Sequence, residues 1–456
     1  MTIMCHGTGD SRLRLRTEPK GRADSASGNV RSDTYPGTVA CLTALALLCV
    51  VVLSLGCKTK SNTPPFPIPE TDVTDLAWPM AGQNIAQTNA ATVEGPDRAS
   101  VRWRVRGRGG ISPLVTNSVD TVCFGTSTNQ VRTIRARDGY LCEAVTLARA
   151  VTAEPAISAG GVVYVGTLGQ TAKRAERDAV LTAAMLALED GKQLWSREVT
   201  SPLRLAPTIA RDGTVYFAYD RTVEALGSDG SRRWRYRAPL QVSTRVCADS
   251  AGNIYFGTAP VYEPDDPQGN PAVISLDSSG RERWFRDVQG AVTCVRVAGD
   301  TVLFTTSGVG LEQGEPASVL YAVTRQGKEK WRIRAPLLLM AVAPNGGAIV
   351  SGGGSSNHRW SSRVLYLLDA EGRRTWSFAL PGEVQDAAID SRGHVYVACY
   401  RRDSDGHAHG GVYSLTAQGV KRWELAGLGA VTSLMLGGEK TLYLTTLDGD
   451  VWAIGC

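Results

Sequence analysis

The pentapeptide GKQLW at Gly191–Trp195 belongs to a repeated motif in which a glycine is followed four residues later by a tryptophan. Six copies occur in the same frame: Gly191–Trp195, Gly230–Trp234, Gly280–Trp284, Gly327–Trp331, Gly372–Trp376 and Gly419–Trp423. Successive copies lie roughly 40 to 50 residues apart, a spacing typical of stacked supersecondary units. The motif therefore predicts a repeat architecture.

Two incomplete copies extend the repeat toward the start of the chain. Gly139 has the same frame but is followed by Glu143 in place of the tryptophan, and Trp103 has no preceding glycine. Between the copies, β-branched and aromatic runs such as TVYFA at 214–218 alternate with glycine-containing turns, a pattern typical of antiparallel meanders. Counting the strands of this kind gives eight units of four strands each.

The two ends of the repeat region complement each other. The run VRWRV at 101–105 matches an isolated fourth strand, and VWAI at 451–454 matches a third strand with no fourth strand after it. Pairing the two would complete an eighth blade and would remove the exposed sheet edges of an open array. We therefore predict an all-β, eight-bladed β-propeller of four-stranded antiparallel blades, its ring closed by N- and C-terminal strands.

The repeated tryptophans are predicted to fill the wedges between neighbouring blades and not to form a ligand platform. The glycine of each motif would supply a turn geometry that a Cβ obstructs. The predicted structural tryptophans are Trp103, Trp195, Trp234, Trp284, Trp331, Trp376 and Trp423.

Residues 1–57 are predicted to be an export signal. Basic residues precede an uncharged stretch, Val39–Leu55, which is followed by Gly56 and Cys57, the order of charged, apolar and small residues found in secretory signals. An uncleaved membrane anchor is the alternative, although a span needs about 20 apolar residues. Residues 58–77 are polar and proline-rich and predict a tether, which leaves 78–456 for the propeller.

The composition is that of a globular protein, with 456 residues, 43% hydrophobic and 20% charged. The net charge of +5 is dispersed along the chain, so a nucleic-acid partner is not expected. Disulfides and free thiols buried in strands are both compatible with the cysteines beyond Cys57. These are Cys123, Cys142, Cys247, Cys294, Cys399 and Cys456.

The Gly-x-x-x-Trp repeat, together with Trp78-Pro79-Met80-x-Gly82, resembles the PQQ-like β-propeller repeat family over about residues 78–456. That family includes quinoprotein dehydrogenases and also non-enzymatic exported lipoproteins such as the BamB-type outer-membrane assembly factor. The end of the export signal resembles a lipobox, which implies lipidation of Cys57. Resemblance to the enzymes would imply PQQ held by two adjacent disulfide-bonded cysteines, a tryptophan, a calcium ion and an aspartate base.

No catalytic constellation is evident in the sequence. The chain contains no Cys-Cys pair, and its histidines form no zinc-binding motif. Asp403, Asp405, His407 and His409 lie in one short stretch and are weak candidate metal ligands, with a solvated polar loop as the alternative. We expect no catalytic residues and no cofactor.

Long connections are predicted between the second and third strands of five blades. In a four-stranded meander these connections emerge on the same face as the links between blades, and long loops gathered on a rigid scaffold are typical of binding surfaces. The alternative is neutral lengthening of tolerated loops. The predicted insertions are 168–182, 259–271, 307–317, 351–363 and 401–411.

Together these features predict a monomeric, lipid-anchored propeller, exported to the outer membrane or periplasm of a Gram-negative cell. It would perform no chemistry and would bind envelope or outer-membrane proteins through its loop-rich face, as a scaffold in outer-membrane protein assembly. Two alternatives remain, a divergent PQQ- or metal-dependent oxidoreductase and a carbohydrate-binding or adhesion propeller.

Overall fold

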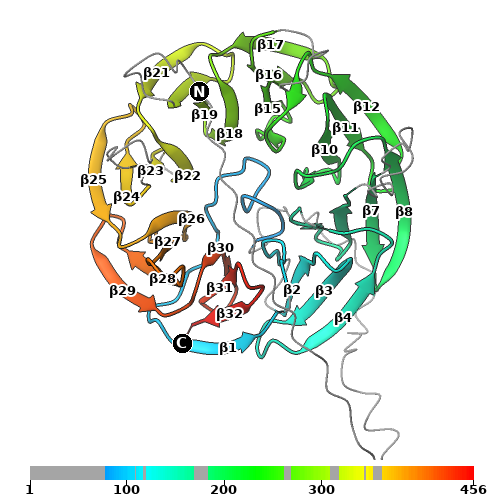
Figure 1. Cartoon of the computed structure of the whole chain (residues 1–456). Helices are drawn as coiled ribbons and strands as arrows, with labels where there is room; N and C mark the ends of the chain where they lie inside the picture. Colours follow the sequence, from blue (N-terminus) through cyan, green and yellow to red (C-terminus); the bar gives the residue numbers. More distant parts are fainter. Residues whose placement is uncertain are drawn as a thin grey trace, which may run out of the picture. The chain divides into compact units, whose positions relative to one another are not determined.

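The structure, a computed structural model, describes residues 78–455 except 108, 117–119, 152, 169–182, 261–268, 309–317, 344–345 and 353–361. Eight antiparallel sheets follow one another around a ring (Figure 1). The prediction of an eight-bladed β-propeller is confirmed. Within the described residues, no helix is long and apolar enough to cross a membrane. The predicted export signal, tether and Cys57 lie outside this part of the chain.

Each blade is a meander that runs from an inner strand at the axis to an outer strand at the rim (Figure 1). In chain order the first blades are β2 (Thr121–Gly125), β3 (Gln130–Arg135) and β4 (Leu141–Thr146); β5 (Ala156–Ile157), β6 (Val163–Gly166), β7 (Ala183–Glu189) and β8 (Lys192–Val199); and β9 (Thr208–Ile209), β10 (Val215–Tyr219), β11 (Thr222–Leu226) and β12 (Arg232–Arg237). The next two are β13 (Gln241–Val242) and β14 (Cys247–Ala248) with β15 (Ile254–Ala259), β16 (Ala272–Leu276) and β17 (Glu282–Asp287); and β18 (Ala291–Ala298), β19 (Thr301–Ser307), β20 (Ser318–Thr324) and β21 (Glu329–Arg334). The last are β22 (Leu338–Val342), β23 (Ala348–Gly352), β24 (Val364–Leu368) and β25 (Arg374–Ala379); β26 (Glu383–Ile389), β27 (Val395–Arg402), β28 (Ala408–Leu415) and β29 (Lys421–Ala426); and β30 (Val431–Gly437), β31 (Thr441–Thr446) and β32 (Val451–Ile454) with β1 (Val101–Val105).

The first blade departs from the predicted four strands. Its sheet contains only β2, β3 and β4, and its inner position is filled by an isolated bridge between Val115 and Cys123. Backbone bonds between these two residues in both directions satisfy the inner edge of β2. A second isolated bridge joins Ile111 to Thr126, so pairing is retained at separate positions instead of along a continuous strand.

The ring is closed by β1, which pairs antiparallel with β32 and places Arg104 opposite Trp452. The Arg104 guanidinium lies 4.4 Å from the centre of the Trp452 ring, and its Nε donates to Asp450 at 3.0 Å. A cation over the face of an indole is attracted by the ring's quadrupole. The predicted closure by strands from the two ends of the repeat region is confirmed.

Neighbouring blades are joined through the tryptophan and glycine of successive motifs. The Trp234 Nε1 donates to the Ser278 carbonyl at 2.9 Å, in the turn that precedes the outer strand of the next blade. Gly280 in that turn has φ +81, and a Cβ there would lie 2.6 Å from the Trp234 ring. Five other junctions show the same two contacts, an indole ring against a glycine and an indole N–H bonded to a carbonyl of the same turn. They pair Trp195 with Gly230, Trp284 with Gly327, Trp331 with Gly372, Trp376 with Gly419 and Trp103 with Gly139.

Residues 78–99, called the axial segment below, pass through the centre of the ring (Figure 1). Their backbone carbonyls accept hydrogen bonds from the inner elements of successive blades, and Gln87 donates through its side chain to Thr208 at 3.4 Å. The strand amides that donate are those of Thr116, Ile157, Ala248, Val297, Val342 and Ile389. The segment therefore acts as a hub, which the sequence did not predict.

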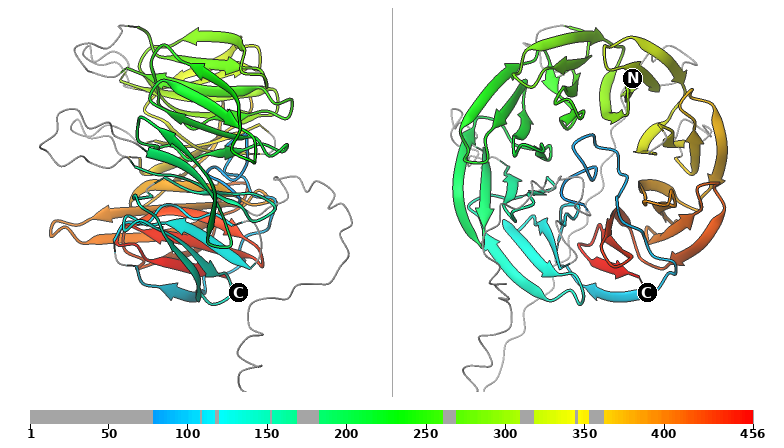
Figure 2. Two further views of the ribbon diagram at one scale, coloured as in Figure 1. Left: turned by 90° about the vertical axis from the view of Figure 1, so that its right-hand side faces the viewer. Right: turned by 180° about the vertical axis from the view of Figure 1, so that it is seen from behind.

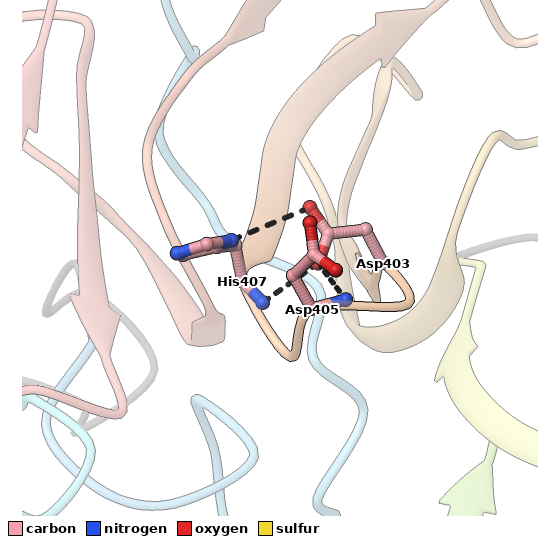
Figure 3. Close-up of side chains that lie close together, drawn as sticks. All are labelled: Asp403, Asp405 and His407. Atoms are coloured by element: carbon pink, nitrogen blue, oxygen red, sulfur yellow. Dashed lines mark hydrogen bonds and ion pairs between the residues drawn. The ribbon is translucent and has the colours of Figure 1, made fainter.

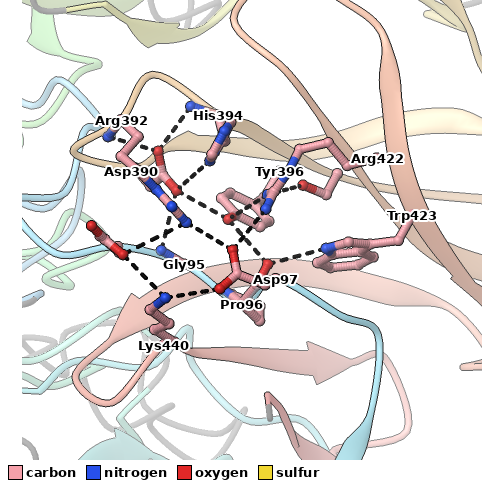
Figure 4. Close-up of polar contacts among 12 residues, drawn as sticks. Gly95, Pro96, Asp97, Asp390, Arg392, His394, Tyr396, Arg422, Trp423 and Lys440 are labelled. Atoms are coloured by element: carbon pink, nitrogen blue, oxygen red, sulfur yellow. Dashed lines mark hydrogen bonds and ion pairs between the residues drawn. The ribbon is translucent and has the colours of Figure 1, made fainter.

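The axial segment leaves the ring through a polar cluster around Asp97 (Figure 4). Asp97 bonds Lys440 and Arg392 at 2.8 Å and Arg422 at 3.1 Å. Lys440 and Arg392 lower the pKa of its carboxyl to about 2. The neighbouring Pro96 carbonyl accepts from Trp423 at 3.1 Å. Pro96 thus replaces the turn carbonyl that the other tryptophans use.

We predict that Gly280→Ala destabilises the fold more than Gly406→Ala. Both glycines have positive φ, but a Cβ at Gly406 has nothing within 4 Å. The control should lose about 1 kcal/mol of unfolding free energy from backbone strain, and Gly280→Ala should lose a further 1 to 3 kcal/mol, approximately, because the Trp234 ring must move. Urea unfolding followed by circular dichroism measures both; equal losses would contradict the proposed wedge contact.

Candidate functional site

The central channel contains two adjoining cavities beside the axial segment. The first, called the arginine cavity, has a volume of about 270 Å³ and is lined by Gln87, Arg204, Ser243, Arg245, Thr293 and Arg296 among others. The second, called the carboxylate cavity, measures about 280 Å³ and is lined by Trp78, Asn89, Glu154, Gln385 and Asp386, with Arg245 and Arg296 shared. Charged side chains of opposite sign thus face the axis.

The face of the ring where the second-to-third strand connections and the links between blades emerge is called the loop-bearing face below. Both cavities lie on this side of the axial segment. Arg245 and Arg296 precede Ala248 and Val297, the residues of β14 and β18 whose amides bind that segment. In an antiparallel meander, inner strands start on the face where the links between blades and the second-to-third connections emerge. The two cavities therefore form a well that opens on that face, with the axial segment at its bottom. The exposed Arg204 lies at its opening.

Two arginines and two carboxylates define the electrostatics of the well. Arg245 forms an ion pair with Glu154 at 2.5 Å. Arg296 is only 7% exposed, and one of its Nη atoms donates to the Gln87 carbonyl. Its Nε is buried and finds no hydrogen-bond partner among the described residues, an arrangement that is uncommon for an interior polar atom.

Asp386 lies on the wall of the carboxylate cavity. Its oxygens accept from Asn89 at 3.3 Å, from the Ala387 amide at 2.9 Å and from the Leu434 amide at 3.1 Å. Desolvation by the surrounding protein outweighs these bonds and raises the pKa of the carboxyl to about 6. Asp386 can therefore change charge near neutral pH.

These charged residues were missed by the sequence analysis, although the repeat carries a signal for them. Glu154, Arg245 and Asp386 each lie ten residues before the tyrosine of the second strand in their blade, at Tyr164, Tyr255 and Tyr396. Aligning the repeats on that tyrosine would have placed all three at one level of the inner strand. A charged residue at this position of the inner strand lies next to the axis of the propeller.

The predicted loop 401–411 is largely strand, which corrects the sequence analysis. Ladder pairing continues through Arg401 with His409 and Arg402 with Ala408, so only the turn 403–407 is irregular. The hairpin of β27 and β28 extends beyond the ring on one face (Figure 2). Backbone hydrogen bonds between β27 and β28 hold this part of the hairpin in strand conformation. Its polar side chains can remain in water, because an antiparallel pair does not need to be covered on both faces. The other four predicted insertions lie largely outside the described residues.

The tip of this hairpin brings the weak candidate metal ligands together. One ligand atom each of Asp403, Asp405 and His407 lies within 4.8 Å of the others (Figure 3). Asp403 accepts from the amides of Asp405 and His407 at 3.0 and 2.8 Å, and it bonds the His409 Nε2 at 2.7 Å. These contacts account for the cluster as a turn stabilised by an aspartate.

Cys123, Cys247 and Cys399 are buried free thiols, and Cys294 is a half-buried free thiol at the arginine cavity. Cys142 is exposed. Of the two possibilities left open by the sequence, free thiols hold for Cys123, Cys247, Cys294 and Cys399. Cys456 lies outside the described residues.

The sequence pattern of one protein family, described as outer membrane protein assembly factor BamB, matches residues 127–266 and 250–455. The chain belongs to the BamB family. The match to the BamB family covers most of the described ring and agrees with the resemblance found in the repeats. Comparison with curated protein sequences gives no match.

Solved structures with the same fold include both BamB and enzymes. BamB from Moraxella catarrhalis is 18% identical, with a TM-score of 0.50, and the match covers 77% of this chain and 96% of that one. Quinohemoprotein alcohol dehydrogenase from Comamonas testosteroni is 13% identical, with a TM-score of 0.57 and coverage of 83% and 80%. The computationally designed Ika8 protein is 13% identical, with a TM-score of 0.59 and coverage of 78% and 100%. At these identities the similarity shows the fold alone.

The residues of the channel do not fit the PQQ site that resemblance to the enzymes would imply. That site needs two adjacent disulfide-bonded cysteines, and the sequence contains no Cys-Cys pair. The axial segment also occupies the centre of the ring, where Trp78, Gly82 and Asn89 line the carboxylate cavity.

We predict that Asp386→Asn gains stability relative to the wild type as the pH rises. The folded wild type holds the Asp386 proton more tightly than the unfolded chain, whose aspartate pKa is 3.8. Wild-type stability therefore falls between about pH 4 and pH 6. The asparagine cannot ionise, so the difference in unfolding free energy should shift by about 2 kcal/mol in its favour.

Urea unfolding of both proteins at pH 4, 5 and 7 measures this shift. The lost carboxylate hydrogen bonds add an offset that is the same at each pH, so the pH-dependent part reports the titration alone. A difference that stays constant from pH 4 to pH 7 would contradict the raised pKa.

Proposed function

We propose that this BamB-family chain is a non-catalytic scaffold of the bacterial envelope that binds proteins, in the service of outer-membrane protein assembly. The observation that carries the proposal is the match of the BamB family over residues 127–266 and 250–455. The structural similarity to BamB from Moraxella catarrhalis supports it. The fold itself is shared with enzymes and does not decide the function.

The loop-bearing face is the proposed binding surface. The hairpin of β27 and β28 projects there, and the well between the blades opens on the same side. The opposite face carries short turns such as Asp277–Arg281, which is held by Asp277 through the amides of Ser279 and Arg281 at 2.9 and 3.0 Å. Longer elements on a rigid ring give the loop-bearing face more contact area.

We also propose that the protein is exported and anchored through a lipid on Cys57. The support is the basic segment, the apolar stretch 39–55 and the lipobox-like residues before Cys57. A lipid at this position would connect through the proline-rich residues 58–77 to the propeller, and would place it in the membrane of a Gram-negative envelope. The proposed propeller acts as a monomer.

Charge reversal on the two faces tests the binding proposal. We predict that Arg401→Glu, in the β27–β28 hairpin, lowers recovery of envelope proteins on the tagged full chain about fivefold or more, as expected for loss of one charged contact. Arg281→Glu, in the β16–β17 turn of the opposite face, should leave recovery unchanged. Both arginines are exposed.

The measurement is co-purification from detergent-solubilised envelopes. Equal effects of the two variants would overturn the assignment of the face. Recovery of polysaccharide without protein would overturn the scaffold and favour the adhesion alternative.

Cys57→Ala tests the anchor. We predict that the wild type is found with membranes as a processed protein, and that the variant is not lipidated because it lacks the thiol. Mass spectrometry of the mature N-terminus and fractionation of cells measure both properties. Processing and acylation that persist in the variant would contradict lipidation at Cys57, and a membrane-bound, unprocessed variant would favour the signal-anchor alternative.

A further inference from the structure

We propose that the arginine cavity is a binding site for an oxyanion, a carboxylate or phosphate group, that enters from the loop-bearing face. The site is formed by Arg204, Arg245 and Arg296. It differs from the outer hairpin of the proposed scaffold surface, and it can exist whether or not that proposal holds.

The charge of the arginine cavity is the first argument. Three arginines line it, and no carboxylate is found among its described lining residues. Glu154 neutralises Arg245 from the carboxylate cavity at 2.5 Å, and Asp386 shares that cavity with Arg296. Against these two carboxylates the three arginines leave one positive charge in excess. Arginine guanidinium groups match the paired oxygens of carboxylates and phosphates.

The unpartnered Nε of Arg296 is the second argument and is independent of charge. Arg296 is only 7% exposed, yet its Nε–H has no acceptor in the described part of the chain. Leaving a buried charged donor unbonded is unfavourable. An oxyanion in the cavity would supply the missing acceptor.

The hydroxyl groups that line the cavity already have hydrogen-bond partners in the protein. Ser243 donates to the Val292 carbonyl at 2.6 Å, and Thr244 donates to the Arg245 carbonyl at 3.1 Å while accepting from Gly257. The Thr293 hydroxyl bonds the Thr305 hydroxyl at 2.8 Å. Binding would therefore depend on guanidinium groups, from the exposed Arg204 at the mouth to Arg296 inside. A volume of about 270 Å³ suits a small anion or one acidic side chain.

Two sources can deliver this group, a free small molecule or an acidic residue of a bound protein. Isothermal titration of the purified full chain with sodium phosphate or disodium succinate, against sodium chloride at equal ionic strength, tests the site without any partner. We expect binding above the chloride background. Arg204→Gln should weaken it about tenfold, as for loss of one charge-assisted contact, and Arg281→Gln on the opposite face should leave it unchanged.

Arg296→Gln should abolish the binding, with circular dichroism to verify the fold, since Arg296 also bonds the axial segment. Arg204 lies at the exposed mouth, so its variant keeps the test valid if Arg296→Gln fails to fold. Absence of binding by either anion, or equal weakening by Arg204→Gln and Arg281→Gln, would overturn the site.

A second arm distinguishes the sources. Succinate added to the envelope co-purification should release the bound protein if its acidic group occupies the cavity, and should leave it bound if the ligand is a free small molecule. Failure to recover any protein would affect the proposed scaffold alone, because the titration does not use a partner.

Discussion

The angle between neighbouring blades depends on indole rings that pack against glycines in left-handed turns. Each ring also donates its N–H to a carbonyl of the next blade, as Trp234 does to Ser278, so the contact has a fixed direction as well as a fixed distance. A single blade cannot bury its apolar faces by itself. Repetition of this contact around the ring joins the blades into one closed structure, and the axis, the well and both faces follow from it.

Much of the fold could be predicted because it repeats. The Gly-x-x-x-Trp frame gave the blades, and the unmatched strands at 101–105 and 451–454 gave the closure that β1 and β32 make. The axial segment could not be predicted, because it has no periodicity and its carbonyls bind strands remote in sequence. The motif also fails at one junction between blades. There the Glu143 carboxylate takes the place of the indole opposite Gly191, and a cavity of about 410 Å³ lies along the junction.

The candidate site shows the opposite balance between sequence and structure. Asp403, Asp405 and His407 are close in sequence, so they attract attention, but their contacts are those of a hairpin turn. Arg245, Arg296 and Asp386 are far apart in the chain and meet only because three inner strands converge on the axis. A function based on such residues becomes visible only when the repeats are aligned on one another and the ring is closed.

The pairing of β1 with β32 also bears on how the chain reaches its native state. Trp103 and Ala453 are paired neighbours in the sheet, but nearly the whole propeller lies between them in the sequence. This contact therefore closes a very long loop and forms late. Until β32 is delivered, the axial segment has a hub position but no complete ring around it. A chain that folds while it is being delivered from its N-terminus would therefore expose unpaired blade edges, and would need protection from aggregation until β32 arrives.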